Sequence, residues 1–386
     1  MKRSSILPIF IIGMLSAFGL TACHEDTSET DYFLIELDKL TDKVKVGTTL
    51  NDIAESVRVI PVETSDSVLF GSLSIVGATD THILAYNISN SAMYQYVCMI
   101  DKEDGSVHIF LNKYGQGPGE YSSMSNVFME SDTVVSLYSD NKYMRYNLQG
   151  KYLGSVSTDS INAYARLPDG NYYVTQPYTS PAPYRTAVYD ENGQLIRNGI
   201  PNDRPAAEYG FRVIGKELPV YNDRLFYREF YGDTLYQVTT EADKPYIVLR
   251  LGALKLPPEL ITAYQQLVNP SNNHIRFVTV YVASHYCFLV FIYNQDYYYS
   301  IWDMDNGELV YANNTAHLST DESAGTTTKR PSATIPVTVN NVELNAWPMY
   351  CDNNTIYCII NPTNVLKLYP NAPEDTNPMI LEVKLK

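Results

Sequence analysis

Asp101-Lys102-Glu103-Asp104-Gly105 is the first of several related turn segments that determine the fold of this 386-residue chain. Each segment starts with Asp or Asn, ends with Gly and is followed closely by an apolar pair. A segment of this kind between strand-like runs predicts a β-hairpin. The others are Asn147-Leu148-Gln149-Gly150, Asp190-Glu191-Asn192-Gly193 and Asp303-Met304-Asp305-Asn306-Gly307. The first three glycines are 45 and 43 residues apart, which indicates a structural repeat.

Two further hairpins without the glycine complete a set of six. Residues 236–238 turn at 241–243 into 246–248, and residues 366–368 turn through 371–376 into 379–381. An inner hairpin is also predicted within Leu167–Val174. Several short strands per repeat of this length are typical of a β-propeller blade. The sequence therefore predicts an all-β, six-bladed β-propeller with four-stranded antiparallel blades. The intervals between the last repeats are longer, so the sequence leaves open whether there is a seventh blade. A pair of β-sandwiches is the alternative fold.

Ring closure and two helices follow from the same pattern. The strand near Val57–Val62 is expected to meet the C-terminal strand Met379–Lys386 and close the ring. A helix of one or two turns is predicted within Thr48–Glu55. A short capping helix is predicted at Pro257–Val268, because Pro stands in its first turn and an acid follows. Polar, Thr-rich Ser319–Ser332 predicts a loop.

The N-terminus predicts export and lipidation. A basic start at Lys2 and Arg3 precedes an apolar run from Ile6 to Leu20, as in a secretory signal. The segment Leu20-Thr21-Ala22-Cys23 resembles the bacterial lipobox, in which the cysteine is acylated and becomes the first mature residue. A plain signal peptide or an uncleaved anchor is the alternative. We expect lipidation at Cys23.

Three regions are predicted from these patterns. Residues 1–22 form the signal peptide, residues 23–48 an acidic tether and N-terminal segment, and residues 49–386 a single propeller domain. The polar stretch after Cys23 has little to bury and predicts a flexible linker. Its acids resemble the surface-export signal of Bacteroidota lipoproteins. We expect an outer-membrane lipoprotein displayed at the cell surface, with the periplasmic face as the alternative.

Composition narrows the possible partners. The formal net charge is −15 and no basic cluster occurs, so nucleic acid is not an expected partner. The apolar stretch Val278–Tyr293 is too short to cross a bilayer, so membrane attachment is expected through the lipid alone. The chain has 33 Tyr but 2 Trp and 12 Phe. Tyrosine suits half-buried strands, and it also suits a sugar- or peptide-binding face.

The remaining cysteines predict buried thiols. Cys351 and Cys358 flank a hairpin turn, Asp352-Asn353-Asn354-Thr355. If Asn353-Asn354 is a two-residue loop, Cys351 faces Ile356 and Cys358 lies diagonal to it on the same face. A Cys351–Cys358 disulfide would need another register and stays open from sequence.

A glycine-rich segment, Gly115-Gln116-Gly117-Pro118-Gly119-Glu120-Tyr121, is the most distinctive motif of the chain. Glycines around a proline permit left-handed backbone where one blade passes to the next. Glu120 and Tyr121 are expected to lock this crossover by bonding to backbone groups. A phosphate cradle is the alternative, but the P-loop Lys-Ser/Thr and the dinucleotide spacing are missing.

This motif resembles the signature of a family of six-bladed β-propeller lipoproteins abundant in Bacteroidota. The patterns Pro61–Thr64, Asp233–Tyr236 and Asn377–Leu381 agree with it more loosely, and the resemblance spans about Leu50 to Lys386. The family resembles NHL-type propellers. The resemblance implies the fold and carries no established activity.

Catalytic motifs are weak. The six histidines, His24, His82, His108, His274, His285 and His317, show no metal-binding spacing, and no Gly-x-Ser-x-Gly elbow occurs. The segment from Asp303 to Gly307 departs from a calcium loop and predicts a hairpin turn. We expect no cofactor and no metal. The predicted function is a binding module that presents one propeller face to a glycan, peptide or partner protein. An enzyme, a lyase or hydrolase acting at the axial mouth, is the alternative, and a structural subunit of an envelope complex is a third possibility.

Overall fold

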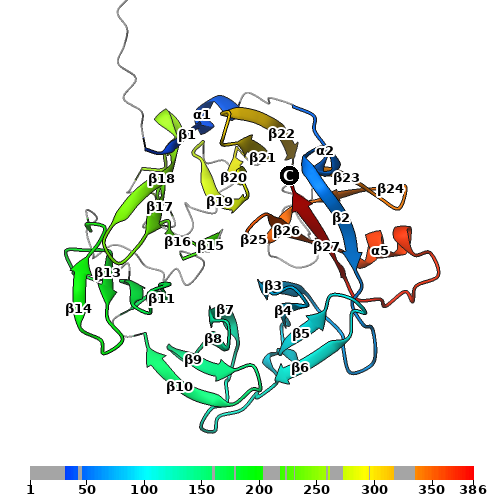
Figure 1. Cartoon of the computed structure of the whole chain (residues 1–386), viewed down its shortest axis with the longest axis horizontal. Helices are drawn as coiled ribbons and strands as arrows, with labels where there is room; N and C mark the ends of the chain where they lie inside the picture. The colour runs from blue at the N-terminus through cyan, green and yellow to red at the C-terminus, as the bar shows by residue number, and fades with distance from the viewer. Residues whose placement is uncertain are drawn as a thin grey trace, which may run out of the picture. The chain divides into compact units, whose positions relative to one another are not determined.

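Six sheets form a ring, and each sheet runs from an inner strand near the centre to an outer strand at the rim (Figure 1). The computed structural model describes residues 31–41, 46–158, 161–177, 180–202, 218–221, 224–229, 231–257, 260, 273–294, 296–316 and 335–386. Tyr32–Lys386 make up one compact unit. The predicted six-bladed β-propeller is confirmed.

The blades are numbered in chain order, and their strands are given from the inside outward. Blade one contains β3 (Leu73–Ala78), β4 (His82–Asn87), β5 (Val97–Asp101) and β6 (Val107–Leu111). Blade two contains β7 (Ser125–Ser131), β8 (Val134–Ser139), β9 (Lys142–Asn147) and β10 (Tyr152–Ser157). Blade three contains β11 (Ala163–Arg166), β12 (Tyr172–Thr175), β13 (Thr186–Tyr189) and β14 (Leu195–Asn198).

The second half of the ring follows the same order. Blade four contains β15 (Val220–Tyr221), β16 (Arg224–Tyr227), β17 (Thr234–Val238) and β18 (Asp243–Arg250). Blade five contains β19 (Arg276–Ala283), β20 (Tyr286–Tyr293), β21 (Asp296–Asp303) and β22 (Glu308–Ala316). Blade six contains β25 (Pro348–Asp352), β26 (Thr355–Ile360), β27 (Met379–Leu385) and β2 (Ala54–Ile60).

The turns that predicted the fold join the third and fourth strands of four blades. They connect β5 to β6, β9 to β10, β13 to β14 and β21 to β22. In each turn the side chain of the first Asp or Asn accepts hydrogen bonds from backbone N–H groups, as Asp101 does from Glu103 (2.7 Å). The predicted pairing of 236–238 with 246–248 is the β17–β18 hairpin, and the inner hairpin within 167–174 is the β11–β12 turn.

The ring closes as predicted, through two ends of the chain. β2 pairs antiparallel with β27, with Val57 opposite Val383 and Ile60 opposite Ile380. Blade six therefore takes its outer strand from the N-terminal part of the sequence. The preceding helix, α2 (Leu50–Ile53), confirms the short helix predicted in this region, and Thr49 and Asp52 form its capping box.

The N-terminal segment also covers the rims of two other blades. β1 (Phe33–Glu36) adds a parallel fifth strand outside β18 of blade four, and α1 (Leu37–Leu40) follows it. Val46 then exchanges two backbone hydrogen bonds with Ala312 on the outer strand of blade five (3.0 and 3.1 Å). The sequence placed the start of the propeller domain at residue 49, whereas the packed unit already includes β1 and α1.

One predicted strand is wrong. Residues 366–368 belong to a helix, α5 (Pro362–Leu368), and not to the outer hairpin of blade six. The Asn361 side chain caps the helix by accepting a hydrogen bond from Asn364 N (2.9 Å), and Pro362 occupies its first turn. These start signals outweigh the alternating pattern that suggested a strand.

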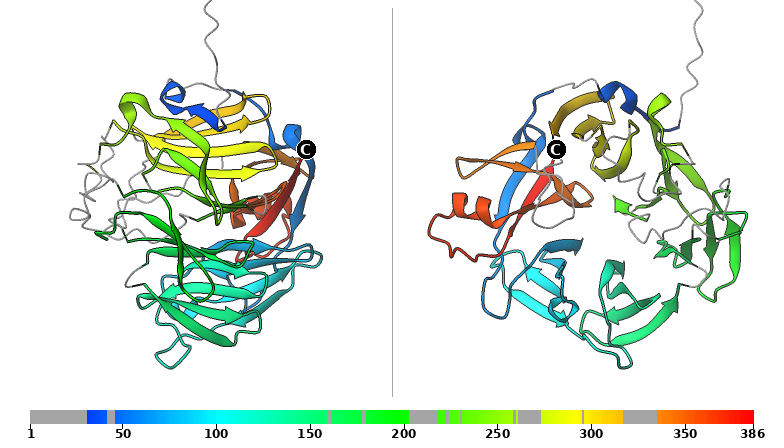
Figure 2. Two further views of the ribbon diagram at one scale, coloured as in Figure 1. Left: turned by 60° about the vertical axis from the view of Figure 1, so that its left-hand side comes forward. Right: turned by 180° about the vertical axis from the view of Figure 1, so that it is seen from behind.

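Other predicted segments are placed as follows. The capping helix at 257–268 and the loop at 319–332 lie largely or wholly outside the described residues. A separate hairpin of β23 (Ile335–Val339) and β24 (Val342–Ala346) precedes blade six. This hairpin and α5 project outward from the ring (Figure 2). No helix within the described ranges is long and apolar enough to cross a membrane.

The four described cysteines are buried, free thiols. Cys351 pairs in register with Ile356 across the two-residue loop Asn353-Asn354, as predicted. Cys351 and Cys358 therefore do not form a disulfide. Their surroundings are the apolar interior shared by blades four, five and six, which also includes Ile35 and Leu37 of the N-terminal segment.

Candidate functional site

The connections between strands separate into two sets, at opposite ends of the sheets. Antiparallel strands alternate in direction, so the Asp-x-x-Gly turns lie at one end, which we call the turn end. The connections at residues 61–72, 88–96, 112–124 and 361–378 lie at the other, the loop end. These four connections are longer than the Asp-x-x-Gly turns, and long loops on a rigid scaffold commonly carry binding residues.

Four large apolar side chains are exposed on three neighbouring connections of the loop end, those at 61–72, 88–96 and 112–124. Their exposed fractions are 47% for Leu69, 56% for Met93, 63% for Tyr94 and 52% for Tyr114. We call these four residues the loop patch. Scattered exposed apolar residues need no explanation, but several of them on adjoining loops are typical of an interaction surface.

Hydrogen bonds to one buried amide place Leu69 beside Tyr94. The Asn87 side chain is almost fully buried, and its Nδ2 donates to the carbonyl oxygens of both Leu69 (3.3 Å) and Tyr94 (2.8 Å). Its Oδ1 accepts from Gly71 N (2.9 Å). A single side chain thus fixes the connection at 61–72 against the one at 88–96.

A buried tyrosine places Tyr114 beside Tyr94 in the same way. The hydroxyl of Tyr121 donates to the carbonyl oxygen of Gln95 (2.8 Å) and accepts from Lys113 N (3.0 Å). Gln95 follows Tyr94 directly, and Lys113 directly precedes Tyr114. Burial raises the pKa of Tyr121 to about 12, so the hydroxyl remains protonated and able to donate at neutral pH.

The glycine-rich segment forms the turn that carries Tyr114. Gly115 N donates to the Tyr121 carbonyl oxygen (3.0 Å), and Gly117 N donates to Glu120 Oε2 (2.8 Å). Gly119 has φ +75°, and a Cβ there would lie 2.8 Å from the Tyr152 side chain. The conformation therefore requires glycine at this position, and the turn holds Tyr121 beneath the loop patch.

Two of the described histidines lie in similar hydroxyl–His–Asp arrangements at the turn end. Thr81 Oγ1 is 2.8 Å from His82 Nδ1, with Asp101 3.8 Å from His82 Nε2. In blade five, Ser284 and His285 stand in the same relation to Asp303, at 3.2 and 3.7 Å. Their repetition in equivalent turns indicates a role in turn structure.

The remaining candidate catalytic or metal-binding residues are also separated from one another. His108 is exposed on β6, His274 precedes β19, and His24 and His317 fall outside the described residues. The Asp303 side chain accepts hydrogen bonds from its own turn, including one from Asp305 N (3.0 Å), as a hairpin turn requires. Among the described residues, no three His, Cys, Asp or Glu side chains cluster closely enough to hold a metal ion.

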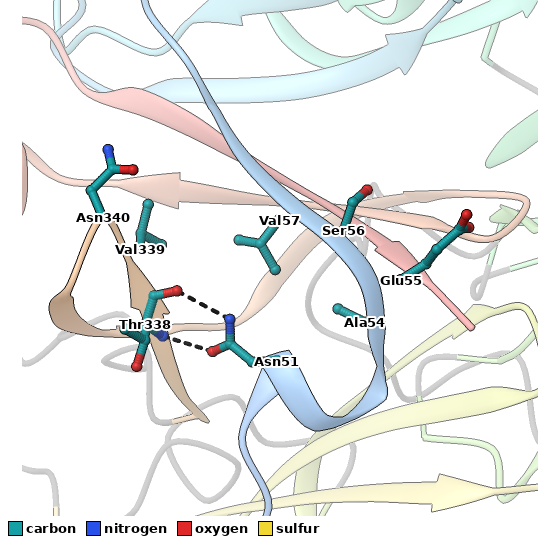
Figure 3. Close-up of a pocket in the computed structure, with 8 residues that line it drawn as sticks. All are labelled: Asn51, Ala54, Glu55, Ser56, Val57, Thr338, Val339 and Asn340. Atoms are coloured by element: carbon teal, nitrogen blue, oxygen red, sulfur yellow. Dashed lines mark hydrogen bonds between the residues drawn. The ribbon is translucent and has the colours of Figure 1, made fainter.

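Two open hollows of about 240 Å³ each lie away from the loop patch. The first lies between α2, β2 and β23, where the Asn51 side chain bonds to both Thr338 N (2.7 Å) and Thr338 O (3.1 Å) (Figure 3). The second lies between blades three and four over Leu167, Leu225 and Val238. The amide bridge is part of the lining of the first hollow, and neither hollow is lined by a histidine.

Sequence reasoning found part of this site. It selected Gly115 to Tyr121, and the structure brings Glu120 and Tyr121 against the backbone of the same turn. It did not select Leu69, Met93, Tyr94 or Tyr114. The predicted lipidation site Cys23 lies outside the described residues.

The chain is similar to one described protein family and to solved structures of exported or uncharacterised proteins. The model of the family described as "Domain of unknown function (DUF4934)" matches residues 33–384. A solved structure of a Bacteroides fragilis protein, described as exported, is similar with a TM-score of 0.64 and 14% identity, over 92% of this chain and 99% of that one. A member of the DUF4221 family from Bacteroides vulgatus is similar with a TM-score of 0.48 and 11% identity, over 86% and 97%.

These findings confirm the resemblance to a propeller family that the glycine-rich motif indicated. At 14% identity, the structural likeness extends to the fold alone. No curated protein matches the chain.

Proposed function

We propose that this chain, which belongs to the DUF4934 family, is a lipid-anchored envelope protein whose propeller binds a partner protein through the loop patch. The observation that carries the proposal is the group of four exposed apolar side chains on connections fixed by buried hydrogen bonds. A surface that is ordered before binding loses less entropy when a partner docks.

The composition of the loop patch favours a protein over a glycan. Tyrosine and methionine are enriched at protein interfaces, and Tyr94 and Tyr114 offer large contact areas with few rotatable bonds. Leu69 and Met93 offer no hydroxyl or amide to a sugar. None of the four residues lines either of the two hollows described above, and their exposed side chains suit a protein partner better than a small substrate.

Anchoring at Cys23 gives the binding surface its location. The signal segment, the lipobox-like Leu20–Cys23 and the acidic residues that follow support export, lipidation and display at the cell surface. Cys23→Ala should move the protein from the membrane fraction to the soluble fraction. Digestion of intact cells by added protease should remove the wild-type protein; full protection would place it in the periplasm instead.

Capture of partners from the native envelope tests the binding surface. The full-length protein and a Met93→Ser/Tyr94→Ser variant would be crosslinked and purified in parallel. The matched control is Leu195→Ser/Ile196→Ser, which removes two exposed apolar side chains from outer strand β14. We expect a protein that is captured by wild type and control but lost with the patch variant. Identical captures from all three would contradict the proposal.

A further inference from the structure

We propose that the loop patch recognises a basic segment of its partner protein, with Lys or Arg side chains lying on the rings of Tyr94 and Tyr114. This inference rests on the proposed function above and specifies the partner's chemistry. It follows from the charges that surround the patch.

Four exposed carboxylates stand on the same loop-end connections as the patch or on the connection bonded to them. They are Asp66, Glu120, Glu374 and Asp375. Within the described part of the chain, none of the four is in ion-pair contact with Lys, Arg or His. The carboxylate of Glu63, on the connection at 61–72, instead accepts a hydrogen bond from Val107 N (3.2 Å) beside a turn-end turn. The same connections carry two basic residues, Lys113 and Lys367. The acids outnumber the two bases, so the surroundings of the patch carry a net negative charge.

Glu120 lies next to the tyrosine side of the patch. Its Oε2 would be only 2.0 Å from a Cβ placed on Gly115, the residue that follows Tyr114. The bond from Gly117 N to the same oxygen holds the carboxylate there. A cation lying on the Tyr114 ring would thus find a fixed negative charge close by.

Asp66 and the acids of the connection at 361–378 lie toward the Leu69 side. Asp66 belongs to the turn closed by Ser65 and Val68, directly before Leu69. Asn377 ties the neighbouring connection to this turn, because its Nδ2 donates to Val68 O (2.7 Å) and its Oδ1 accepts from Phe70 N (2.9 Å). Glu374 and Asp375 are carried by that same bonded connection.

Exposed aromatic rings and carboxylates that have no ion-pair partner together fit Lys and Arg. A cation over a tyrosine ring is attracted by the ring quadrupole, by about 0.5–1 kcal/mol at exposed sites. The aliphatic stems of Lys and Arg can lie on Leu69 and Met93 while their charged ends reach the carboxylates. The net charge of −15 also attracts a basic partner over a longer range.

An array of short random-sequence peptides, probed with the purified full chain, tests this inference. Bound peptides should be enriched in Lys and Arg, and binding should weaken about tenfold when salt rises from about 0.05 to about 0.5 M. Asp66→Asn/Glu120→Gln should weaken it about threefold, and Tyr94→Ser/Tyr114→Ser about tenfold. The matched control Glu191→Gln, in a turn-end turn, should bind as wild type. Thermal melting of each variant checks that it is folded.

The outcomes separate the two proposals. Binding to neutral or acidic peptides that depends on the patch but not on salt would overturn the basic-partner inference and leave the proposed function standing. Patch-dependent binding to a glycan array, with no enrichment of basic peptides, would overturn the inference and the protein partner together. The inference is also overturned if peptide binding is unchanged in both patch variants. The same holds if the protein does not bind basic peptides selectively.

Discussion

The outer edges of the two halves of the ring differ. In the half made of blades four, five and six, the N-terminal region lies against the outer strands of blades four and five, through β1 and Val46, and supplies β2 as the outer strand of blade six. Blades one, two and three end in β6, β10 and β14, and no described strand pairs with the outer side of these three. The half closed by the N-terminal region therefore depends on contacts that are distant in sequence, whereas the open half depends on contacts between consecutive blades.

The largest effect is expected from the covered half. Ile35 of β1 is fully buried among residues of blades four and five. Ile35→Ala should lower the free energy of unfolding by about 3–4 kcal/mol, because it leaves a cavity under the added strand. The control is the neighbouring exposed residue, Leu34→Ala, which should cost less than about 1 kcal/mol. Equal effects in urea denaturation would mean that β1 is a passive extension.

A contact between blades one and two should give the next largest effect. Gly150 has φ +70°, and a Cβ there would lie 2.1 Å from the carbonyl oxygen of Phe110 on the outer strand of blade one. Gly150→Ala should cost about 3 kcal/mol from strain and displacement of that strand. Gly193 has φ +77° with no atom within 4 Å, so Gly193→Ala should cost only about 1 kcal/mol.

If Gly150→Ala and Gly193→Ala lower the free energy of unfolding by the same amount, the turns do not hold the blades together. The comparison is sensitive because both glycines occupy the same place in the repeat. They differ only in what lies beside them.

A smaller effect is expected beneath the loop patch. Tyr121→Phe removes one hydroxyl and leaves Gln95 O and Lys113 N without their partner, which should cost about 2 kcal/mol. Exposed Tyr114→Phe should change stability by less than about 0.5 kcal/mol. A stable Tyr121→Phe protein that binds its partner normally would show that this hydrogen-bonded support is dispensable.

The smallest effect is on local opening of the folded structure, and it leaves the free energy of unfolding unchanged. Burial raises the pKa of Cys287 to about 12 and also raises the pKa of Cys98, so at about pH 8 both are protonated and unreactive until the structure opens. Cys98 lies in blade one, with its open edge, and Cys287 in blade five. Alkylation followed by mass spectrometry should modify Cys98 first. Faster modification of Cys287 would reverse the assignment of the weaker half.

The fold was predictable because the repeat is local. Each Asp-x-x-Gly turn needs only neighbouring residues to bend the chain, so its sequence and spacing are visible without the structure. Residues 366–368 were misassigned because an alternating pattern fits a short strand, while the Asn361-Pro362 start decides for helix. β1 was missed because four residues carry a weak pattern and their partner strand is distant in sequence.

The candidate site was less predictable for a related reason. The chain has 33 tyrosines, and composition cannot show which are exposed. Tyr121 is fully buried and Tyr94 is mostly exposed, although both lie on loop-end connections. The glycine-rich motif was visible, but its proximity to Tyr94 depends on a hydrogen bond between two connections.

Site-specific photocrosslinking in living cells tests the central claim, binding through the loop patch, most directly. A photoreactive phenylalanine derivative would replace Tyr94, and in a second strain Ile196 on the outer strand of blade three. Binding through the loop patch predicts a discrete covalent adduct with a partner protein from position 94 and none from position 196. No adduct from position 94, or the same adduct from both, would contradict it.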